Sequence, residues 1–381
     1  MRLSHCHNFQ DFRLLAKKRL PSPIYNYIDG GADDEVTLKR NTDAFDNVDL
    51  VPNVLRGITD PDISVEVMGQ KLATPFYCSP TALQRLFHHQ GERAVAAAAE
   101  KHGTLFGVSS LGTVSLEEIA RQTSTPQVYQ FYFHKDRELN KAMMDRAKEA
   151  GIEVMMLTVD SITGGNRERD LRTGFSIPMK LNLNGLLQFA IKPMWGINYV
   201  THEKFSLPQL DQHVDMDGGA KSIGDYFTHM LDPSMNWEDV AEMVKLWDGE
   251  FCLKGVMSVE DAQKAVDIGC TGIIISNHGG RQLDGSRSSF DHLEEIVNAV
   301  GDKIDVLFDS GVQRGTHVLK ALSLGAKAVG VGRLYLYALA AAGQPGVERA
   351  LGLLQTEIIR DMKLMGCASV KDLTKENLRF R

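Results

Sequence analysis

Short apolar runs, rich in β-branched and aromatic residues, recur along the chain from Pro75 onward. Each has the length of a strand and is apolar on both faces, as strands buried inside a parallel sheet are. We therefore predict eight strands, at Pro75–Ser79, Thr104–Ser109, Gln127–Tyr132, Glu153–Val159, Phe251–Val256, Gly272–Ser276, Asp305–Asp309 and Ala326–Val331.

Segments with helical apolar spacing lie between these runs. The main ones are Gly91–His102, Leu116–Arg121, Leu139–Ala150, Val259–Ile268, Asp291–Val300 and Thr316–Leu324. Strand and helix alternating eight times indicate an α/β fold, the (β/α)8 TIM barrel. An open doubly wound sheet is the alternative, but it would carry GxGxxG after its first strand, and none is present.

The remaining segments predict additions to a single domain spanning residues 1–381. Asn8–Leu20 has helical spacing and ends before a proline, whereas residues 43–71 are irregular apart from a strand-like piece, Ile63–Val67. We interpret residues 1–70 as an N-terminal helical cap and 71–381 as the barrel. A long insert at about 175–235 follows strand four, where connections are ordinarily short.

The strand ends carry the candidate chemistry, because the loops at the C-terminal face of a TIM barrel form its active site. His278 and Arg281 leave one strand end together, separated by two glycines. A histidine exchanges protons near neutral pH, and an arginine binds a carboxylate or phosphate with two parallel hydrogen bonds. Alone, HxxR is better explained as a polar loop. The other strand ends favour a site, since they add Thr81, Ser109, Gln130, Tyr132, Thr158, Asp160, Lys254, Ser276, Asp309, Arg314 and Arg333.

Composition and charge narrow the range of functions that the protein can have. A net charge of −7 argues against nucleic-acid binding. The five cysteines are odd in number and lack CxxC spacing, which favours buried reduced thiols in a reducing compartment. No apolar signal-peptide core and no apolar run of membrane-spanning length occur, so we expect a cytoplasmic protein. We expect no metal site.

Glycine-rich turns follow the last two predicted strands, in DSGVQRG and GVGR. Such turns, leading into helix N-termini, are the usual phosphate site of barrels. We therefore expect a phosphorylated ligand or cofactor near Gly311, Gly332 and Arg333.

The ordered motifs resemble those of the FMN-dependent α-hydroxy-acid oxidases and dehydrogenases, the family of L-lactate dehydrogenase, mandelate dehydrogenase and glycolate oxidase. They are PTAL (80–83), QFY (130–132), LTVD (157–160) with a later Arg167, LKGV (253–256), SNHGGRQLD (276–284), DSGVQRG (309–315) and GVGR (330–333). The resemblance covers nearly the whole chain, and SNHGGRQLD at a strand end is its most specific part.

The resemblance implies a role for each matching residue. His278 would be the catalytic base, paired with Asp160, while Lys254 would stabilise the reduced flavin. Arg281, Arg167, Tyr27 and Tyr132 would bind the substrate carboxylate and hydroxyl, with Leu111 and Ala82 beside the substrate carbon. The residues implied to line FMN are Pro80, Thr81, Ala82, Ser109, Gln130, Thr158, Lys254, Ser276, Asp309, Gly311, Gly332 and Arg333.

Three positions depart from the family pattern. Gln313 stands where many relatives have an arginine at the FMN phosphate, and the loss of that bond weakens cofactor binding unless Arg314 or Arg333 compensates. Leu111 stands where glycolate oxidases have a tryptophan, so the pocket should admit more than glycolate. Asn166 replaces a residue that is often basic, with no effect that we can assign.

The sequence of the insert helps to predict which electron acceptor the protein uses. Residues 181–200 are apolar and aromatic but are interrupted by Pro193 and Gly196 and are too short to span a bilayer. One interpretation is peripheral docking on the inner face of the cell membrane, as in membrane-associated relatives. The other is a lid packed on the barrel or on a neighbouring subunit. Gly280 matches the dehydrogenase-type NHGG motif, which favours a quinone as acceptor.

The sequence thus predicts an FMN-dependent L-2-hydroxy-acid dehydrogenase, with L-lactate as leading substrate, a quinone or other acceptor, and a homotetrameric assembly. The alternatives are a soluble oxidase that makes hydrogen peroxide and a mandelate-type dehydrogenase. Outside this class, Lys254 at a strand end could belong to a Schiff-base aldolase, or the barrel could bind a phosphorylated ligand without catalysis.

Overall fold

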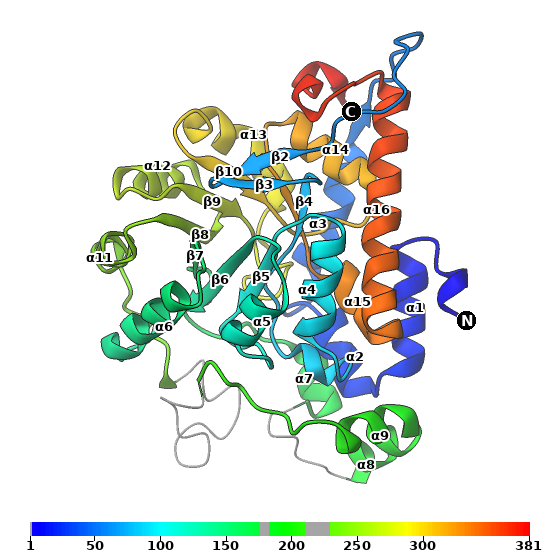
Figure 1. The fold of residues 1–381 in the computed structure, drawn as a ribbon, viewed down its shortest axis with the longest axis vertical. Coiled ribbons are helices and arrows are strands. Elements are labelled where there is room, and N and C mark those ends of the chain that lie inside the picture. The colour runs from blue at the N-terminus through cyan, green and yellow to red at the C-terminus, as the bar shows by residue number, and fades with distance from the viewer. Residues whose placement is uncertain (1, 176–182, 211–228) are drawn as a thin grey trace.

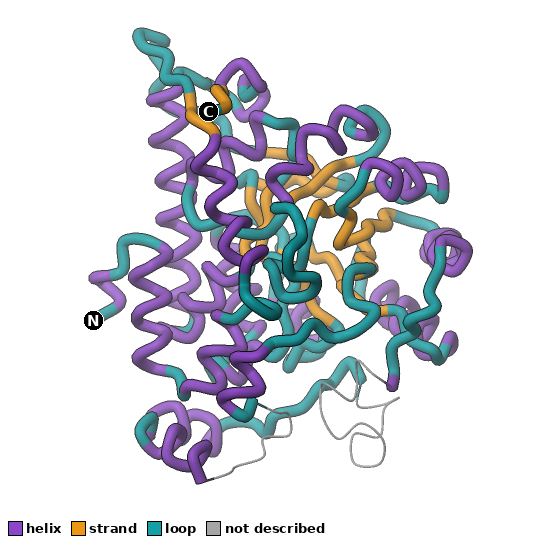
Figure 2. Tube along the Cα trace, turned by 180° about the vertical axis from the view of Figure 1, so that it is seen from behind, coloured by secondary structure: helices purple, strands orange, loops and turns teal. Residues whose placement is uncertain are grey.

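The computed structural model describes residues 2–175, 183–210 and 229–381. Its centre is a closed barrel of eight parallel strands in the order β10-β11-β4-β5-β6-β7-β8-β9, surrounded by helices (Figure 2). The strands are β4 (Phe76–Cys78), β5 (Phe106–Ser109), β6 (Gln127–Tyr132), β7 (Val154–Thr158), β8 (Glu250–Val256), β9 (Gly272–Ile275), β10 (Asp305–Phe308) and β11 (Val329–Val331). The TIM barrel prediction is confirmed, with each strand inside or within one residue of its predicted range.

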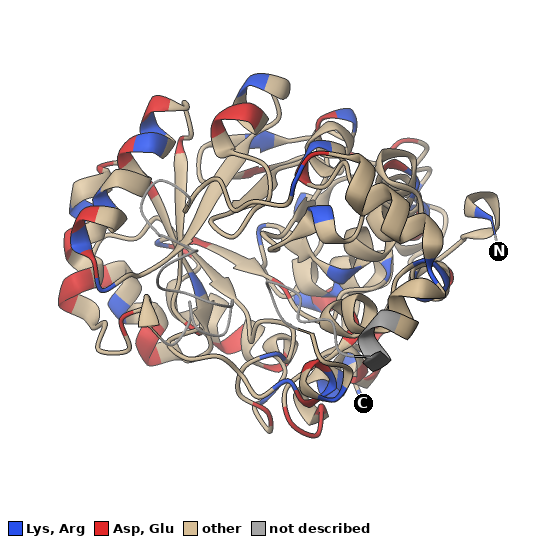
Figure 3. Ribbon diagram, turned by 90° about the horizontal axis from the view of Figure 1, so that it is seen from below, with Lys and Arg blue, Asp and Glu red and all other residues tan. Residues whose placement is uncertain are grey.

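Helices follow the strands, and six of them (α4, α5, α6, α12, α13 and α14) lie where the apolar spacing predicted them, whereas α11, α15 and α16 were not predicted. They are α4 (Glu92–Lys101), α5 (Leu116–Gln122), α6 (Arg137–Glu149), α11 (Trp237–Trp247), α12 (Val259–Asp267), α13 (Ser289–Val300), α14 (Gly315–Ser323), α15 (Arg333–Ala342) and α16 (Gln344–Met365). Gly103 and Gly325 follow two of these helices with φ of +59° and +97°, a region that glycine enters without steric cost. Seen from below, charged residues of both signs lie mostly on the outer helices and loops (Figure 3).

The hairpin of β2 (Val65–Val67) and β3 (Gln70–Leu72) lies at the end of the barrel away from α7 (Glu168–Thr173) (Figure 1). Its Met68 packs in the barrel interior with apolar side chains of the strands. The backbone N–H of Met68 also donates to Asp305 at 2.6 Å. The strand β2 lies within the piece predicted at Ile63–Val67, whereas β3 was not predicted, because it has no apolar alternation of its own.

The N-terminal residues form α1 (Phe9–Arg19), α2 (Ser22–Asp29) and α3 (Val36–Asp43), followed by β1 (Val48–Leu50). Figure 1 shows α1 beside α15 and α16, and β1 pairs antiparallel with the last strand, β12 (Leu378–Phe380). The pattern predicted neither β1 nor β12, since each is three residues long and is stabilised by a partner at the other end of the chain. These elements bring α2 and α3 to the barrel mouth.

The insert after β7 contains α7, α8 (Leu183–Ala190) and α9 (Pro193–Thr201), while its residues 176–182 and 211–228 lie outside the described part. Phe189 and Trp195 are partly buried, and the Trp195 indole donates to the Leu86 carbonyl at 2.7 Å. Five aliphatic side chains are more than half exposed: Leu187, Ile191, Met194, Ile197 and Val200. We call these five the apolar patch. No described helix is both long and apolar enough to cross a membrane.

Candidate active site

A cavity of about 620 Å³ opens at the C-terminal ends of the barrel strands. Most of the predicted site residues line it: Tyr27, Pro80, Thr81, Ala82, Ser109, Leu111, Tyr132, Arg167, Lys254, His278, Arg281, Asp309, Gly311, Gly332 and Arg333. The structure therefore brings together residues from seven strand ends, from α2 and, with Arg167, from the insert after β7. Four predicted residues, Gln130, Thr158, Asp160 and Ser276, lie behind this wall and contact the residues that form it.

His278 is held by Asp160. The Nδ1 of His278 lies 2.9 Å from Asp160 Oδ1, which also accepts from the Ser161 hydroxyl at 2.9 Å. His278 has a φ of +58°, strained for a residue with a side chain, and two glycines follow it in the same region. A Cβ at Gly255 would lie 2.6 Å from the Asp160 Cβ, so the LKGV glycine makes room for this carboxylate.

Burial and charge act in opposite directions on this pair. Burial lowers the pKa of His278 and Asp160 raises it in part, so it stays below the usual histidine value. Burial raises the pKa of Asp160, but the charges of His278 and Lys254 outweigh this and hold it below the carboxyl value. At neutral pH the pair is therefore a neutral imidazole beside a carboxylate, which is the state that a general base requires.

Two guanidinium groups lie over the ring of Tyr27. The Cζ of Arg281 is 4.9 Å and that of Arg167 is 5.6 Å from the ring centroid. Arg281 donates to the carbonyls of Tyr27 at 2.6 Å and Gly30 at 3.2 Å. Burial, followed by the charge of Arg167, lowers the pKa of Arg281 to about 10, so it is still charged at neutral pH. Two cations at one cavity wall form a site for an anion.

Tyr132, on β6, lines the same part of the cavity, and burial raises the pKa of its hydroxyl, which therefore stays protonated. Leu111, which is buried, and Ala82 line the wall formed by the loops after β5 and β4. Their side chains are apolar, so this wall suits an apolar group on the ligand.

Lys254 ends β8 and donates to the Ser276 hydroxyl at 2.9 Å, with Asp309 3.6 Å away. Burial alone would lower the pKa of Lys254, but the charges of Asp309 and Asp160 raise it above its ordinary value. The side chain is therefore an ammonium ion, which disfavours the aldolase alternative because a Schiff base forms from a neutral amine.

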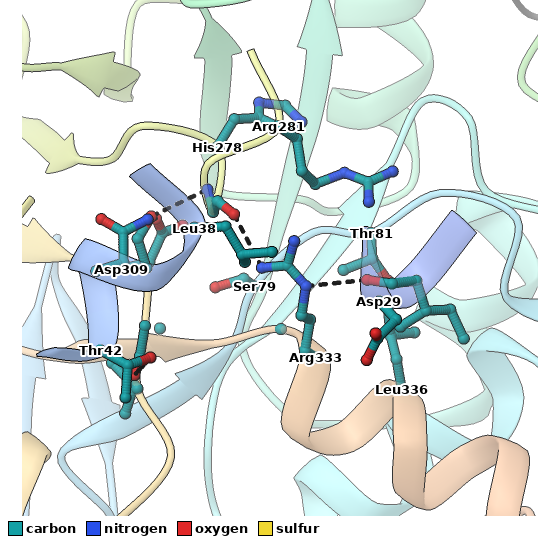
Figure 4. Close-up of a pocket in the computed structure, with 18 of the residues that line it drawn as sticks. Asp29, Leu38, Thr42, Ser79, Thr81, His278, Arg281, Asp309, Arg333 and Leu336 are labelled. Carbon is teal, nitrogen blue, oxygen red and sulfur yellow. Dashed lines mark hydrogen bonds between the residues drawn. The ribbon is translucent and has the colours of Figure 1, made fainter. Parts of the chain in front are cut away.

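The turns after β10 and β11 present backbone to the cavity. Gly332 precedes α15, and a Cβ there would meet only the Thr81 methyl, at 3.9 Å, so that it would project into the cavity. Arg333 rises from α15 towards the loop of His278 and Arg281 (Figure 4) and donates to the Gly279 carbonyl at 3.0 Å. Gln313 also lines the cavity, whereas Arg314 does not line it and pairs with Glu357 at 3.1 Å.

Sequence reasoning missed the contribution of the N-terminal helices. Asp29, Leu38 and Thr42 line the cavity, and Asn41 exchanges two amide hydrogen bonds, of 2.8 and 2.7 Å, with Asn277. The signal in the sequence is the pair Gly30 and Gly31, which follows Tyr27. Gly31 in that pair leaves no room for a side chain, since a Cβ would lie 2.8 Å from the Gly280 carbonyl.

The cavity suits FMN. It offers an open backbone cradle at Gly332 next to a helix N-terminus, which fits a phosphate, and the buried ammonium of Lys254, which fits an electron-rich ring edge. The same cavity is also lined by the anion site of Arg281 and by the hydroxyls of Thr81 and Ser109. The donor set thus accommodates both a phosphorylated cofactor and a small anion.

Comparisons with known proteins agree with this geometry. The profile described as FMN-dependent dehydrogenase matches residues 16–380. L-lactate oxidase of Nostoc sp. is 39% identical over 96% of this chain and 96% of its own. L-lactate dehydrogenase of Alcaligenes faecalis is 38% identical over 97% of each chain. The crystal structure of the monotopic membrane protein (S)-mandelate dehydrogenase superposes with a TM-score of 0.94 at 35% identity, over 99% of this chain and 100% of that one. This chain therefore belongs to the FMN-dependent dehydrogenase family.

Proposed function

We propose that the protein oxidises an L-2-hydroxy acid to the 2-oxo acid, with L-lactate as the leading substrate. The observation that carries this is the placement of a neutral histidine, held by a carboxylate, in the same cavity wall as two arginines. A hydroxy acid needs both, because its carboxylate requires a cation and its departing proton requires a base. FMN, when bound, accepts the two electrons that leave the substrate.

His278 uses Nε2 as the base, since its Nδ1 is held by Asp160. The carboxylate of Asp160 stabilises the imidazolium that forms, and Ser161 keeps that carboxylate oriented. Arg281 and Arg167 bind the substrate carboxylate, and the Tyr132 hydroxyl hydrogen-bonds the substrate. Lys254 places a positive charge at the cavity wall, where it stabilises negative charge on the reduced ring.

The substrate side chain faces Leu111 and Ala82 in this proposal. Leucine and alanine leave room for a methyl group or something longer, which favours L-lactate over glycolate. A mandelate-type substrate is the second candidate, supported by the TM-score of 0.94 to (S)-mandelate dehydrogenase. Leu111→Trp fills the space and is expected to shift the preference towards glycolate by about tenfold or more, corresponding to 1–3 kcal/mol.

The direct test is anaerobic mixing of the purified yellow protein with L-lactate, glycolate and (S)-mandelate, following loss of the oxidised flavin absorbance. We expect L-lactate to reduce the flavin fastest and D-lactate not to reduce it. A protein that takes up no FMN, or whose FMN none of the acids reduces, would refute the proposed function. The fastest reduction by mandelate would change the substrate and leave the chemistry intact.

For the electron acceptor, we propose a membrane quinone, reached by peripheral docking through α8 and α9. The exposed aliphatic side chains of the apolar patch support this, because insertion of each contributes about 1.5–3 kcal/mol when fully buried. Lys17, Lys18 and Arg19, at the end of α1, are exposed next to Lys192, which donates to the carbonyl of Lys18 at 2.6 Å. Cations beside an apolar face suit an anionic lipid surface.

Sedimentation with vesicles of phosphatidylglycerol and phosphatidylethanolamine tests the docking. The triple variant Ile191→Ser, Met194→Ser, Val200→Ser should lose vesicle binding and quinone reduction while keeping anaerobic FMN reduction by substrate. Leu364→Ser is the control, since Leu364 is 62% exposed on α16. Rapid peroxide formation in air by a wild-type protein that does not sediment would instead identify a soluble oxidase. A homotetramer remains part of the proposal and is tested by light scattering.

A further inference from the structure

A buried carboxylate joins four helices beside the cavity. Asp29, the last residue of α2, is 4% exposed. It accepts hydrogen bonds from Arg13 of α1 at 2.5 and 2.9 Å, Arg169 of α7 at 2.8 Å, Tyr337 of α15 at 2.7 Å and Tyr25 at 2.9 Å. Burial raises the pKa of Asp29, but these donors, led by Arg13, outweigh it and hold the pKa well below its ordinary value. The carboxylate is therefore ionised and its partners are fixed.

Arg169 is the member of this network that comes from the insert. One guanidinium nitrogen donates to Asp29 and the other donates to Glu35. Glu35 in turn accepts from the backbone N–H of Gly31 at 2.9 Å. The Cβ and Cδ of Arg169 would each lie 3.6 Å from a Cβ on Gly30, so its stem packs flat against the turn after α2. Arg169 thus spans the turn and attaches α7 to it.

The two helices joined in this way carry anion-site residues. Tyr27 lies two residues before Asp29, and Arg167 lies two residues before Arg169. The Tyr27 ring lies under the guanidinium of Arg167, and the carbonyls of Tyr27 and Gly30 accept from Arg281. Arg169 itself does not line the cavity. Arg169 therefore acts on the ligand through its neighbours, of which Arg167 and Tyr27 lie at the anion site and Asp29 and Glu35 line the cavity.

Polar contacts supply much of what holds α7 in place. The helix has six residues and none of them is buried. Asn166, just before it, donates to the Asp33 side chain at 2.8 Å and its carbonyl accepts from the Asp33 backbone N–H at 2.9 Å. Beyond the helix, Phe175 stacks on Tyr27 at 4.5 Å. Arg167 also faces the like charge of Arg281, which the Asp170 carboxylate, 4.0 Å from Arg167, offsets in part.

We propose that Arg169, held between Asp29 and Glu35, is a positioning residue that sets Arg167 over Tyr27 to receive the substrate carboxylate. The inference rests on the proposed function, because it assigns that carboxylate to the Arg167–Arg281 site. Asp29 is held by donors from other helices as well, so it stays in place when Arg169 is substituted. Without the contacts of Arg169, Arg167 keeps its charge but is displaced. Substrate binding therefore weakens, whereas proton transfer to His278 and FMN binding do not change.

The test compares Arg169→Gln with Arg172→Gln. Arg172 is on the same helix, its side chain is 73% exposed, and it pairs only with Glu168 among the described residues. Anaerobic FMN reduction is measured against L-lactate concentration. We expect Arg169→Gln to raise the half-saturating concentration about tenfold with a limiting rate within about twofold of wild type, since a small displacement at a binding group weakens binding severalfold or more. Arg172→Gln should match wild type, and the dissociation constant of FMN should not change in either variant.

Three further variants and one binding measurement complete the test. Glu35→Gln leaves Asp29 intact and should also raise the half-saturating substrate concentration with little change in limiting rate, but by a smaller factor than Arg169→Gln. The double variant of Glu35→Gln and Arg169→Gln should have a half-saturating concentration no higher than that of Arg169→Gln alone. Arg169→Lys should recover part of the loss. The binding of oxalate, read from the flavin spectrum, reports the anion site without turnover and should weaken in parallel. Equal half-saturation for Arg169→Gln and Arg172→Gln, or a fall in limiting rate alone, would overturn the proposal. A wild type whose FMN no hydroxy acid reduces would refute the proposed function instead, and oxalate binding would still test the role of Arg169.

Discussion

Two parts of the cavity wall are built on different principles. The β9 loop presents ionisable side chains, His278 and Arg281, each held by a specific partner. The turns after β10 and β11 present the open backbone of Gly332 and the neutral side chain of Gln313, while Gly311 packs closely against the Asn41 backbone. Proton transfer and carboxylate recognition need particular functional groups, whereas a phosphate can be bound by amides that every residue possesses. Substitutions should therefore have larger and more selective effects in the β9 loop than in the turns.

The largest effect is expected at the base. His278→Gln keeps the size and polarity of the side chain but cannot take up the proton, so FMN reduction by substrate should slow by about 10²–10⁴-fold. The dissociation constant of FMN, measured by flavin fluorescence, should stay within about twofold. His292→Gln, on the outer helix α13, is the matched control. Retention of most of the rate would remove His278 from the mechanism.

Asp160→Asn tests how the Asp160 carboxylate changes the pKa and the reactivity of His278. The base is active when neutral, so kcat/KM should rise with pH through the pKa of His278 and then level off. Because the carboxylate raises that pKa, its removal should shift the acid limb to lower pH. The plateau should also fall, by about 10²-fold, since the imidazolium loses its counter-ion. An acid limb that moves to higher pH in the variant would contradict this assignment.

Arg281→Lys keeps the charge but loses the fork of parallel donors. Loss of one charge-assisted hydrogen bond costs about 1.5–3 kcal/mol, so the half-saturating substrate concentration should rise by about 30-fold, with a lower rate as well. Titration with substrate under anaerobic conditions measures both. If the lysine variant binds as well as wild type, the carboxylate is not bound by Arg281.

The smallest effect is expected in the turns. Gln313→Arg adds a cation to the turn after β10, where Arg314 does not line the cavity and the charged residue that does is Asp309. The dissociation constant of FMN should fall by about tenfold, from a gain at the lower end of the same range. Substrate half-saturation should not change. Weaker FMN binding would mean that the hydrogen bond from Gln313 to Thr42, 3.1 Å long, matters more than the charge.

The sequence was sufficient for the barrel and for the cavity wall, because both depend on local order. A strand such as Gly272–Ile275 is apolar on both faces, and the residues that follow a barrel strand lie at its mouth by topology. The sequence could not predict which strand-end side chains reach the cavity and which lie behind its wall. Gln130 and Thr158 lie at strand ends next to residues of the wall, yet they hydrogen-bond each other behind it. Depth depends on side-chain direction in a closed barrel.

Contacts between distant segments also could not be predicted. Asp29 and Arg169 are separated by 140 positions, and neither has an unusual local pattern. Asn166, to which we could assign no effect from the sequence, donates a hydrogen bond to Asp33. Such pairs follow from the tertiary arrangement of α2 and α7, which no periodicity encodes. In contrast, the pairing of Asp160 with His278 was implied by the family resemblance, because both residues belong to its motifs.

The pairing of β1 with β12 has a consequence for how the chain is made. Val48 pairs with Phe380, and Arg381 pairs with Asp49 at 2.6 Å, so the strand that follows α3 gains its partner only from the final residues. During synthesis, β4 likewise waits for β11 before the barrel can close. The helices that bring Asp29 and Asn41 to the cavity therefore gain this support only after residues 378–381 have been synthesised. A nascent chain on the ribosome holds the motifs of the site without yet holding the site.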